Sequence, residues 1–254
     1  MSVTTMKPTT TRRPLLIAAA LVVVLGAALY LSGVWGGMGA QLVHEPVGQP
    51  LGAATHADVT IAIGMGRLRL GTLDRPSTLI AGDITYPDSN HVTRDFALRG
   101  DTATFALREQ DSQANSLVKY RQDAAIWDLR LSPTTPMRLT LEAGIGENTI
   151  DLALLHVTEL DLKTGVGNTT LTLPREGHLL AQVEGGVGNT TIRVPAGVAL
   201  RLTINAGVGS VSVPANYWRQ GDVAVSPEYE TAANRVDLTA SSGVGNITIQ
   251  QISE

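Results

Sequence analysis

One pattern recurs at a fixed spacing in this chain: a Gly-x-Gly triplet, then a polar residue and a run of β-branched residues. Its first glycines lie 21 residues apart over four successive copies, and a fifth copy follows after 36 residues, an interval with a 15-residue insertion within 215–235. A more distant copy, GMGRLRL, stands at 64–70. Equal intervals indicate stacked structural repeats, so the repeat dictates the architecture. The five glycine pairs are Gly144 and Gly146, Gly165 and Gly167, Gly186 and Gly188, Gly207 and Gly209, and Gly243 and Gly245.

The residues around each glycine pair alternate between apolar and polar. In one repeat Leu160 and Leu162 precede the glycines, and Leu171 and Leu173 follow them with the opposite phase. A period of two indicates a strand with one buried face. The change of phase is what a corner produces when both strands point inward, and glycine supplies the positive φ or tight geometry of such a corner. Each unit is therefore predicted to be one coil of strand, corner, strand and turn, and the fold an all-β solenoid of coils of about 21 residues.

The position after the glycines holds Asn168, Asn189, Ser210 and Asn246. Asparagine side chains at equivalent positions of stacked coils can form an amide ladder. Three of these positions also read N-x-T, the pattern of a glycosylation acceptor. The ladder is the favoured interpretation because it accounts for all four positions.

The N-terminal part has the charge pattern of a membrane anchor. Residues 1–14 carry Lys7, Arg12 and Arg13 without an acidic residue, and 15–36 form an uncharged apolar stretch that would span about 33 Å as a helix. The positive-inside rule then places the N-terminus in the cytoplasm and the C-terminal body outside. A cleaved signal peptide, cut near Gly39 or Ala40, is the alternative. We expect a cytosolic tail (1–14), one transmembrane helix (15–36), a Gly/Pro-rich linker (37–56) and the solenoid (57–254).

Composition excludes several functions. The chain has no cysteine, which removes disulfides, thiol catalysis and thiolate metal sites, and its net charge of −4 gives no footprint for nucleic acid. Its five histidines are scattered, and it has neither a nucleophile elbow nor a phosphate-binding loop. We therefore predict no catalytic residue, no cofactor, no metal ion and no enzymatic activity.

The insertion carries Tyr217, Trp218 and Tyr229, a large share of an aromatic content of only 4%. Aromatic side chains in such an excursion can anchor a partner protein. They can equally cap the open end of a solenoid, where an uncovered coil invites further strand addition. The cap is the favoured interpretation.

The stretch WDLRLSPTTPMRLTLEAGIGENTIDL at 127–152, the GVG repeats and NRVDLTASSGVGNITI at 234–249 resemble the toast-rack family. These bacterial envelope proteins are related to the C-terminal domain of LiaF-like, cell-wall-active-antibiotic response proteins and to adhesin-like solenoids. The resemblance covers 57–254 and implies a single-stranded right-handed β-helix without a defined catalytic set.

We expect a membrane-anchored extracytoplasmic interaction or structural domain that serves envelope maintenance or the envelope stress response. Its expected partners are the membrane and an envelope protein or polysaccharide. An adhesin or self-assembling surface scaffold is the alternative function, and a polysaccharide-acting β-helix enzyme is the third.

Overall fold

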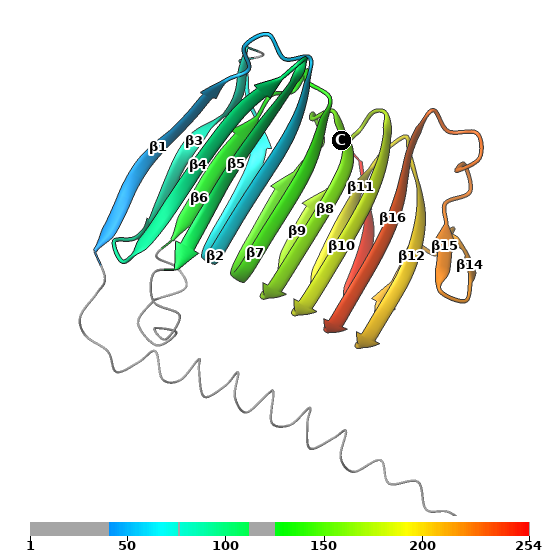
Figure 1. Ribbon diagram of the computed structural model, residues 1–254. Coiled ribbons are helices and arrows are strands. Elements are labelled where there is room, and N and C mark those ends of the chain that lie inside the picture. The colour runs from blue at the N-terminus through cyan, green and yellow to red at the C-terminus, as the bar shows by residue number, and fades with distance from the viewer. Residues whose placement is uncertain (1–40, 76, 112–124, 254) are drawn as a thin grey trace, which may run out of the picture. The chain divides into compact units, whose positions relative to one another are not determined.

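The computed structural model describes residues 41–75, 77–111 and 125–253, which belong to one compact unit. This part of the chain is built from β-strands, which confirms the expected all-β class (Figure 1). Among these residues no helix is long and apolar enough to cross a membrane. The expected tail (1–14) and transmembrane helix (15–36) lie outside the described residues.

The described strands are β1 (Leu42–Pro50), β2 (His56–Thr72), β3 (Thr78–Pro87), β4 (Asn90–Arg99), β5 (Thr102–Asp111), β6 (Ile126–Leu131), β7 (Met137–Asp151), β8 (Val157–Val166), β9 (Thr169–Thr172), β10 (His178–Val187), β11 (Thr190–Pro195), β12 (Val198–Val208), β13 (Val211–Ser212), β14 (Trp218–Gln220), β15 (Val223–Val225), β16 (Asn234–Val244) and β17 (Ile247–Ile252).

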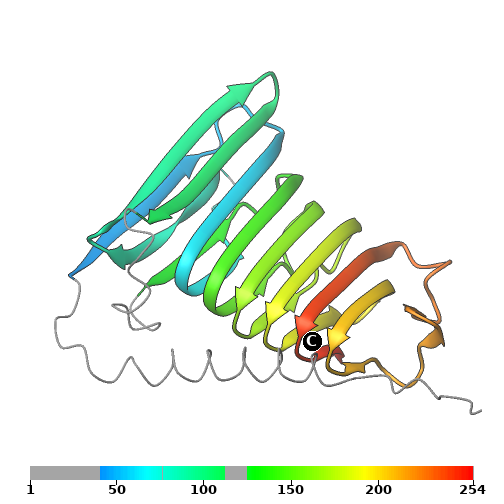
Figure 2. The ribbon, with the colours of Figure 1, turned by 60° about the horizontal axis from the view of Figure 1, so that its bottom comes forward.

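The strands form two layers that are joined at the glycine corners (Figures 1 and 2). Sheet 1 has the order β4-β5-β2-β7-β8-β10-β16-β12-β15-β14, and sheet 2 has the order β1-β3-β6-β2-β7-β9-β11-β17-β13. Strands β2 and β7 are long enough to bend at the corner and take part in both. A coil is thus one pass along sheet 1 and one along sheet 2, and neighbouring coils pair in parallel.

The coils do not stack in chain order. The last coil, β16 and β17, lies between the β10–β11 coil and the β12–β13 coil, and it pairs in parallel with both (Figure 1). At the other end, β2 lies between β7 and the coil made by β5 and β6. The repeated sequences are so alike that each coil can pair with any other. The alternation of apolar and polar residues therefore does not determine the spatial order of the coils.

The expected linker (37–56) is partly wrong. Its residues Leu42–Pro50 form β1, which pairs antiparallel with β3 and adds an edge strand to sheet 2. Pro46 and Pro50 are compatible with this place because proline is tolerated on an edge strand, where one side of the backbone has no partner. The folded part therefore begins before residue 57.

The core lies between the two layers and consists of columns of like residues. One column in sheet 1 runs through Val59, Leu139, Leu160, Ala181, Leu238 and Leu202, and all six are buried. Trp127, on β6, is fully buried near the end of the stack that β1 and β4 form. Each fully buried Leu or Ile contributes about 1.5–3 kcal/mol, so the columns stabilise adjacent coils together.

The coils approach one another most closely at the glycine corners. A Cβ built on Gly186 would collide with the carbonyl oxygen of Gly165 in the neighbouring coil, although the φ of Gly186 is not positive. At Gly188 two constraints coincide, since its φ is +140° and a Cβ there would collide with the Gly167 carbonyl. The first glycine of a pair is thus required by close approach, and the second also by its backbone conformation.

Gly186→Ala should lower the free energy of unfolding by about 1–3 kcal/mol, because the new methyl group pushes two coil backbones apart. The matched control is Gly71→Ala in β2, where a Cβ would have nothing within 4 Å. We expect this control to change stability by less than about 0.5 kcal/mol. Urea denaturation of residues 41–254 measures both. Equal stability of the two variants would show that the corner does not depend on glycine.

Candidate functional site

The outer face of sheet 1 carries two straight rows of side chains across five coils, all of them polar except Leu180. Parallel pairing in register places equivalent residues of successive coils side by side, so the rows follow from the stacking. One row is Thr140, Asp161, Gln182, Thr239 and Thr203, and the other is Arg138, Glu159, Leu180, Asp237 and Arg201.

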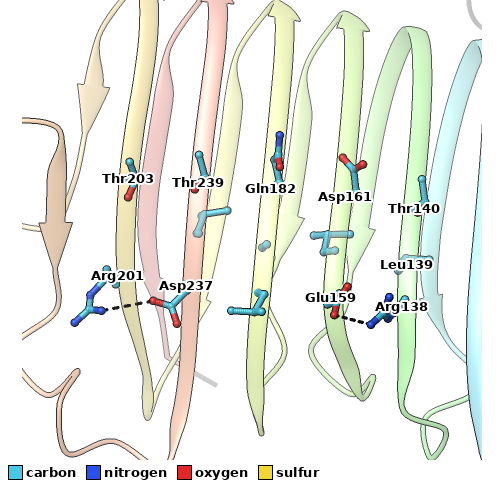
Figure 3. Close-up of a pocket in the computed structure, with 14 residues that line it drawn as sticks. Arg138, Leu139, Thr140, Glu159, Asp161, Gln182, Arg201, Thr203, Asp237 and Thr239 are labelled. Atoms are coloured by element: carbon cyan, nitrogen blue, oxygen red, sulfur yellow. Dashed lines mark ion pairs between the residues drawn. The ribbon is translucent and has the colours of Figure 1, made fainter.

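These rows line an open groove of about 680 Å³ (Figure 3). At its centre Leu180 is 51% exposed, with Glu159 on one side and Asp237 on the other. The groove therefore has an apolar centre within a polar and charged surround, which is the composition of a protein interaction surface.

The charges of the groove are paired. Arg138 Nη2 lies 3.0 Å from Glu159 Oε1, and Lys163 Nζ lies 3.4 Å from Asp161 Oδ2. The second oxygen of Asp161, Oδ1, is buried and has no hydrogen-bond partner among the described residues. Exposed pairs of this kind contribute little to stability. They give the groove charges of both signs close together.

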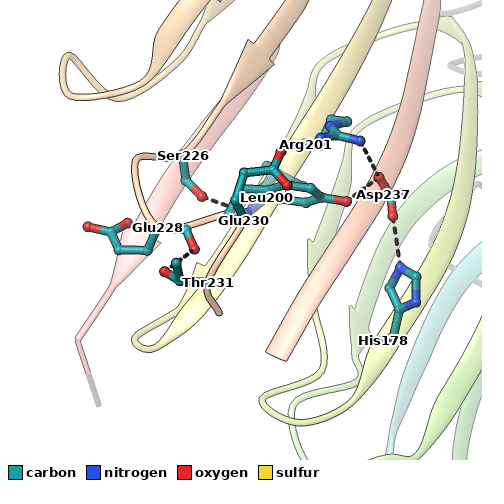
Figure 4. A network of polar contacts seen from close by, with 9 residues as sticks. His178, Leu200, Arg201, Ser226, Glu228, Glu230, Thr231 and Asp237 are labelled. Atoms are coloured by element: carbon teal, nitrogen blue, oxygen red, sulfur yellow. Dashed lines mark hydrogen bonds and ion pairs between the residues drawn. The ribbon is translucent and has the colours of Figure 1, made fainter. Parts of the chain in front are cut away.

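Asp237 is the centre of a polar network at one end of the groove (Figure 4). His178 Nε2 lies 2.8 Å from Asp237 Oδ2, Arg201 Nη1 lies 4.0 Å from Oδ1, and the Tyr229 hydroxyl donates a hydrogen bond to Oδ1. Partial burial opposes ionisation of Asp237, but these hydrogen bonds and the charges of His178 and Arg201 outweigh it and lower its pKa. The network joins three neighbouring coils to the insertion.

The insertion covers the end of the stack. Strand β15 pairs antiparallel with the outer edge of β12, and β14 pairs with β15 (Figure 1). Backbone and side chain of Ser226 exchange hydrogen bonds with Leu200, and the Arg201 guanidinium lies 4.2 Å from the centre of the Tyr229 ring.

The three aromatic residues singled out in the insertion have different places. Tyr217 and Tyr229 are buried, and burial raises the pKa of each hydroxyl to about 12. Trp218 is 59% exposed on β14. The two tyrosines thus belong to a cap over the β12–β13 coil at the end of the stack, while Trp218 lies on the outer surface of the cap.

The polar residues after the glycine corners form a ladder in spatial order. The Asn168 side-chain oxygen accepts bonds from the backbone and side-chain nitrogens of Asn189, and Asn189 accepts the same pair from Asn246. Asn246 in turn accepts bonds from the backbone nitrogen and the hydroxyl of Ser210. The corners of β2 and β7 have no asparagine at this position. Arg67 and Glu147 occupy it there and form an ion pair, with Arg67 Nη2 3.3 Å from Glu147 Oε2. The ladder therefore links neighbouring coils at their corners through side-chain hydrogen bonds.

The described residues contain no group of three or more His, Asp or Glu side chains arranged to hold a metal ion. Of the histidines, His178 contacts Asp237 and His56 lies 3.5 Å from Asp101, at separate places in the fold. The carboxylates of the groove lie in ordered ion pairs, and this arrangement is suited to binding by shape and charge.

Sequence reasoning missed the groove. Its residues occupy outward positions of strands whose inward positions were recognised. They recur at the 21-residue spacing of the repeat, as in Thr140, Asp161 and Gln182, but their side-chain chemistry differs from one repeat to the next. Only the places of Asp237 and Thr239 within the rows depend on the spatial order of the coils, in which β16 lies between β10 and β12. A signal was available in Leu180, an apolar residue at a position where alternation predicts a polar one.

The chain matches the family described as the N-terminal domain of toast_rack, DUF2154, over residues 41–193, which is more than half of its length. It therefore belongs to the toast-rack family, as the resemblance implied. No curated protein matches it.

Among solved structures, a proposed cell adhesion protein from Clostridium sporogenes is similar, with a TM-score of 0.74 and 20% identity over 84% of this chain and 100% of that one. A proposed adhesin from Bacteroides fragilis has 15% identity and a TM-score of 0.33, over 82% of this chain and 97% of the other. The first of these similarities establishes a shared fold.

Tyr229→Ala should lower the free energy of unfolding by about 3 kcal/mol, because it removes a buried ring and leaves a cavity beneath the cap. The matched variant is Trp218→Ala, which removes a larger but mostly exposed ring from the same insertion and should cost less than about 1 kcal/mol. Thermal and urea denaturation of residues 41–254 compare the two. A larger loss from Trp218→Ala than from Tyr229→Ala would contradict the cap.

Proposed function

We propose that this chain is a membrane-anchored, extracytoplasmic interaction domain that serves cell-envelope maintenance or the envelope stress response. The observation that carries the proposal is the groove on sheet 1. Its two rows of side chains cross five coils, its charges are paired within the surface, and Leu180 is exposed at its centre. Such a surface binds by complementarity and needs no reactive group.

The location rests on the sequence. The basic residues 1–14 and the uncharged stretch 15–36 favour a single anchor with the N-terminus inside, so that the domain lies outside the membrane. A stack of paired coils suits a domain outside the membrane, because strand pairing alone fixes the positions of the side chains on its outer face. The partner is an envelope protein or polysaccharide that lies along the groove.

Adhesion or self-assembly at the surface is the second candidate. One observation favours it: β4 pairs with β5 alone in the described part of the chain, so one long strand edge faces outward. A polysaccharide-acting enzyme is the third candidate, and the groove supports it least because its carboxylates lie in ion pairs with basic side chains.

The test replaces the gene in the producing bacterium by the wild type, by Leu180→Arg or by Leu154→Arg. Arginine at 180 lies between Glu159 and Asp237, which compensate its charge, and it fills the centre of the groove. Leu154, in the turn between β7 and β8, is 63% exposed and provides a control of the same chemistry away from the groove.

Loss of the gene should raise sensitivity to a cell-wall-active antibiotic. The wild type and Leu154→Arg should restore resistance, and Leu180→Arg should not, at equal amounts in the membrane fraction and equal accessibility to external protease. Restoration by both variants would contradict a role for the groove. Unchanged sensitivity without the gene would contradict the envelope role.

A further inference from the structure

In the part of the chain that the structure describes, one end of the stack is capped and the other is not. Beyond β12 the hairpin of β14 and β15 covers the coil edge, and on sheet 2 the short β13 is followed by Pro214. At the opposite end, the outermost strands are β1 on sheet 2 and β4 on sheet 1 (Figure 2). Within the described ranges each of these two pairs on one side only.

The edge of β4 lacks the features that keep a strand edge from pairing. It has ten residues paired with β5 without a register shift, and it contains no proline, glycine or lysine. Natural edges are usually interrupted by such residues or by an inward-pointing charge. Arg94 points inward, but its guanidinium lies 2.8 Å from Glu45 Oε1, which compensates the charge. By contrast, β1 carries Pro46 and Pro50.

The same strand exposes apolar residues that face the interior. Phe96 and Leu98 lie opposite Phe105 and Ala103 of β5, both of which are buried. Yet Phe96 is 42% exposed and Leu98 is 46% exposed, because the stack ends beside them. An additional strand along β4 would bury both side chains and satisfy the outward-facing backbone groups.

We propose that the occupant of this edge is a second copy of the same chain, paired antiparallel through β4 about a two-fold axis at Ala97. This register places Asp95 opposite the partner's Arg99 and Phe96 opposite the partner's Leu98. Opposite charges and apolar pairs facing each other across antiparallel strands are both stabilising. The described residues offer neither Asp95 nor Arg99 an ion-pair partner within one copy, so the dimer supplies one for each.

Other registers fit less well. Residues directly opposite each other in an antiparallel pair lie on the same face of the sheet. The inward faces of the two copies therefore lie on one side only when the axis passes through a residue, and not between two residues. An axis at Arg94 or Asp95 places like charges opposite each other, and one at Phe96 places Arg94 opposite the partner's Leu98. An axis at Leu98 leaves Arg99 opposite Ala97 and Phe96 opposite Gly100. With the axis at Ala97, oppositely charged residues face each other and apolar residues face each other across the two copies.

The absence of cysteine in the chain makes the register directly measurable. At a two-fold axis through residue 97 the two Cα atoms lie about 4.5–5.5 Å apart, within the range of a disulfide. The full-length Ala97→Cys variant, oxidised in membranes of the producing bacterium, should therefore form a disulfide-linked homodimer on a non-reducing gel.

Two controls separate this register from random collision. Thr93→Cys lies on the same strand, but its two copies would be about 27 Å apart along the antiparallel pair. Ser212→Cys lies on β13 at the capped end. Both should give at least about tenfold less dimer than Ala97→Cys. Equal crosslinking of all three, absence of a crosslink at residue 97, or a crosslink from it to a different protein would each overturn the proposal.

Charge reversal tests the pairing itself. In the Ala97→Cys background, Asp95→Arg or Arg99→Asp alone places like charges opposite each other and should lower the dimer yield about three- to tenfold. The double variant restores opposite charges and should restore the yield. Failure of restoration would overturn the register. This inference is independent of the function proposed for the groove, because the dimer edge and the groove consist of different residues; it shares the β4 edge with the second candidate, self-assembly.

Discussion

The structure depends on how closely the coil backbones approach at their corners. The carbonyl oxygen of one corner lies where the Cβ of the next would be, at Gly144, Gly165, Gly186, Gly207 and Gly243 alike. Only glycine permits this approach, and it fixes the register of each coil against its neighbours. Inward columns, the asparagine ladder and the outward rows are all consequences of that register.

A fixed register has different effects along the stack and at its ends. Along the stack it turns the outward residues of five coils into one ordered groove, in which Arg138, Glu159, Asp161 and Lys163 are held by ion pairs. At the ends the repeat stops and the last strand edge must be covered. The insertion does this beyond β12 with Tyr217 and Tyr229, whereas β4 remains a free edge in the described part of the chain.

Local features were predictable from the sequence because each depends on a few neighbouring residues. The change of phase around Gly165 and Gly167 predicted a corner, and Asn168, Asn189, Asn246 and Ser210 form the ladder that their equivalent positions suggested. The order of the coils was not predictable, because either Asn246 or Ser210 could form the hydrogen bond to Asn189. The contacts of Asp237, which lies between Leu180 and Arg201, depend on that order and were missed with it. Strand β1 was hidden by the prolines that its edge position tolerates.

The most direct measurement is of the coil order, with cysteine pairs in a chain that has none of its own. Residues 189 and 246 belong to adjacent coils, at a strand spacing of about 4.8 Å that a disulfide can bridge, whereas residues 189 and 210 are separated by one coil, at about 9.6 Å. Oxidation of Asn189→Cys/Asn246→Cys should therefore give an intramolecular disulfide, and Asn189→Cys/Ser210→Cys should give none. The reverse result would show that the coils stack in chain order and would contradict both the position of the last coil and the network in which its Asp237 contacts His178 and Arg201.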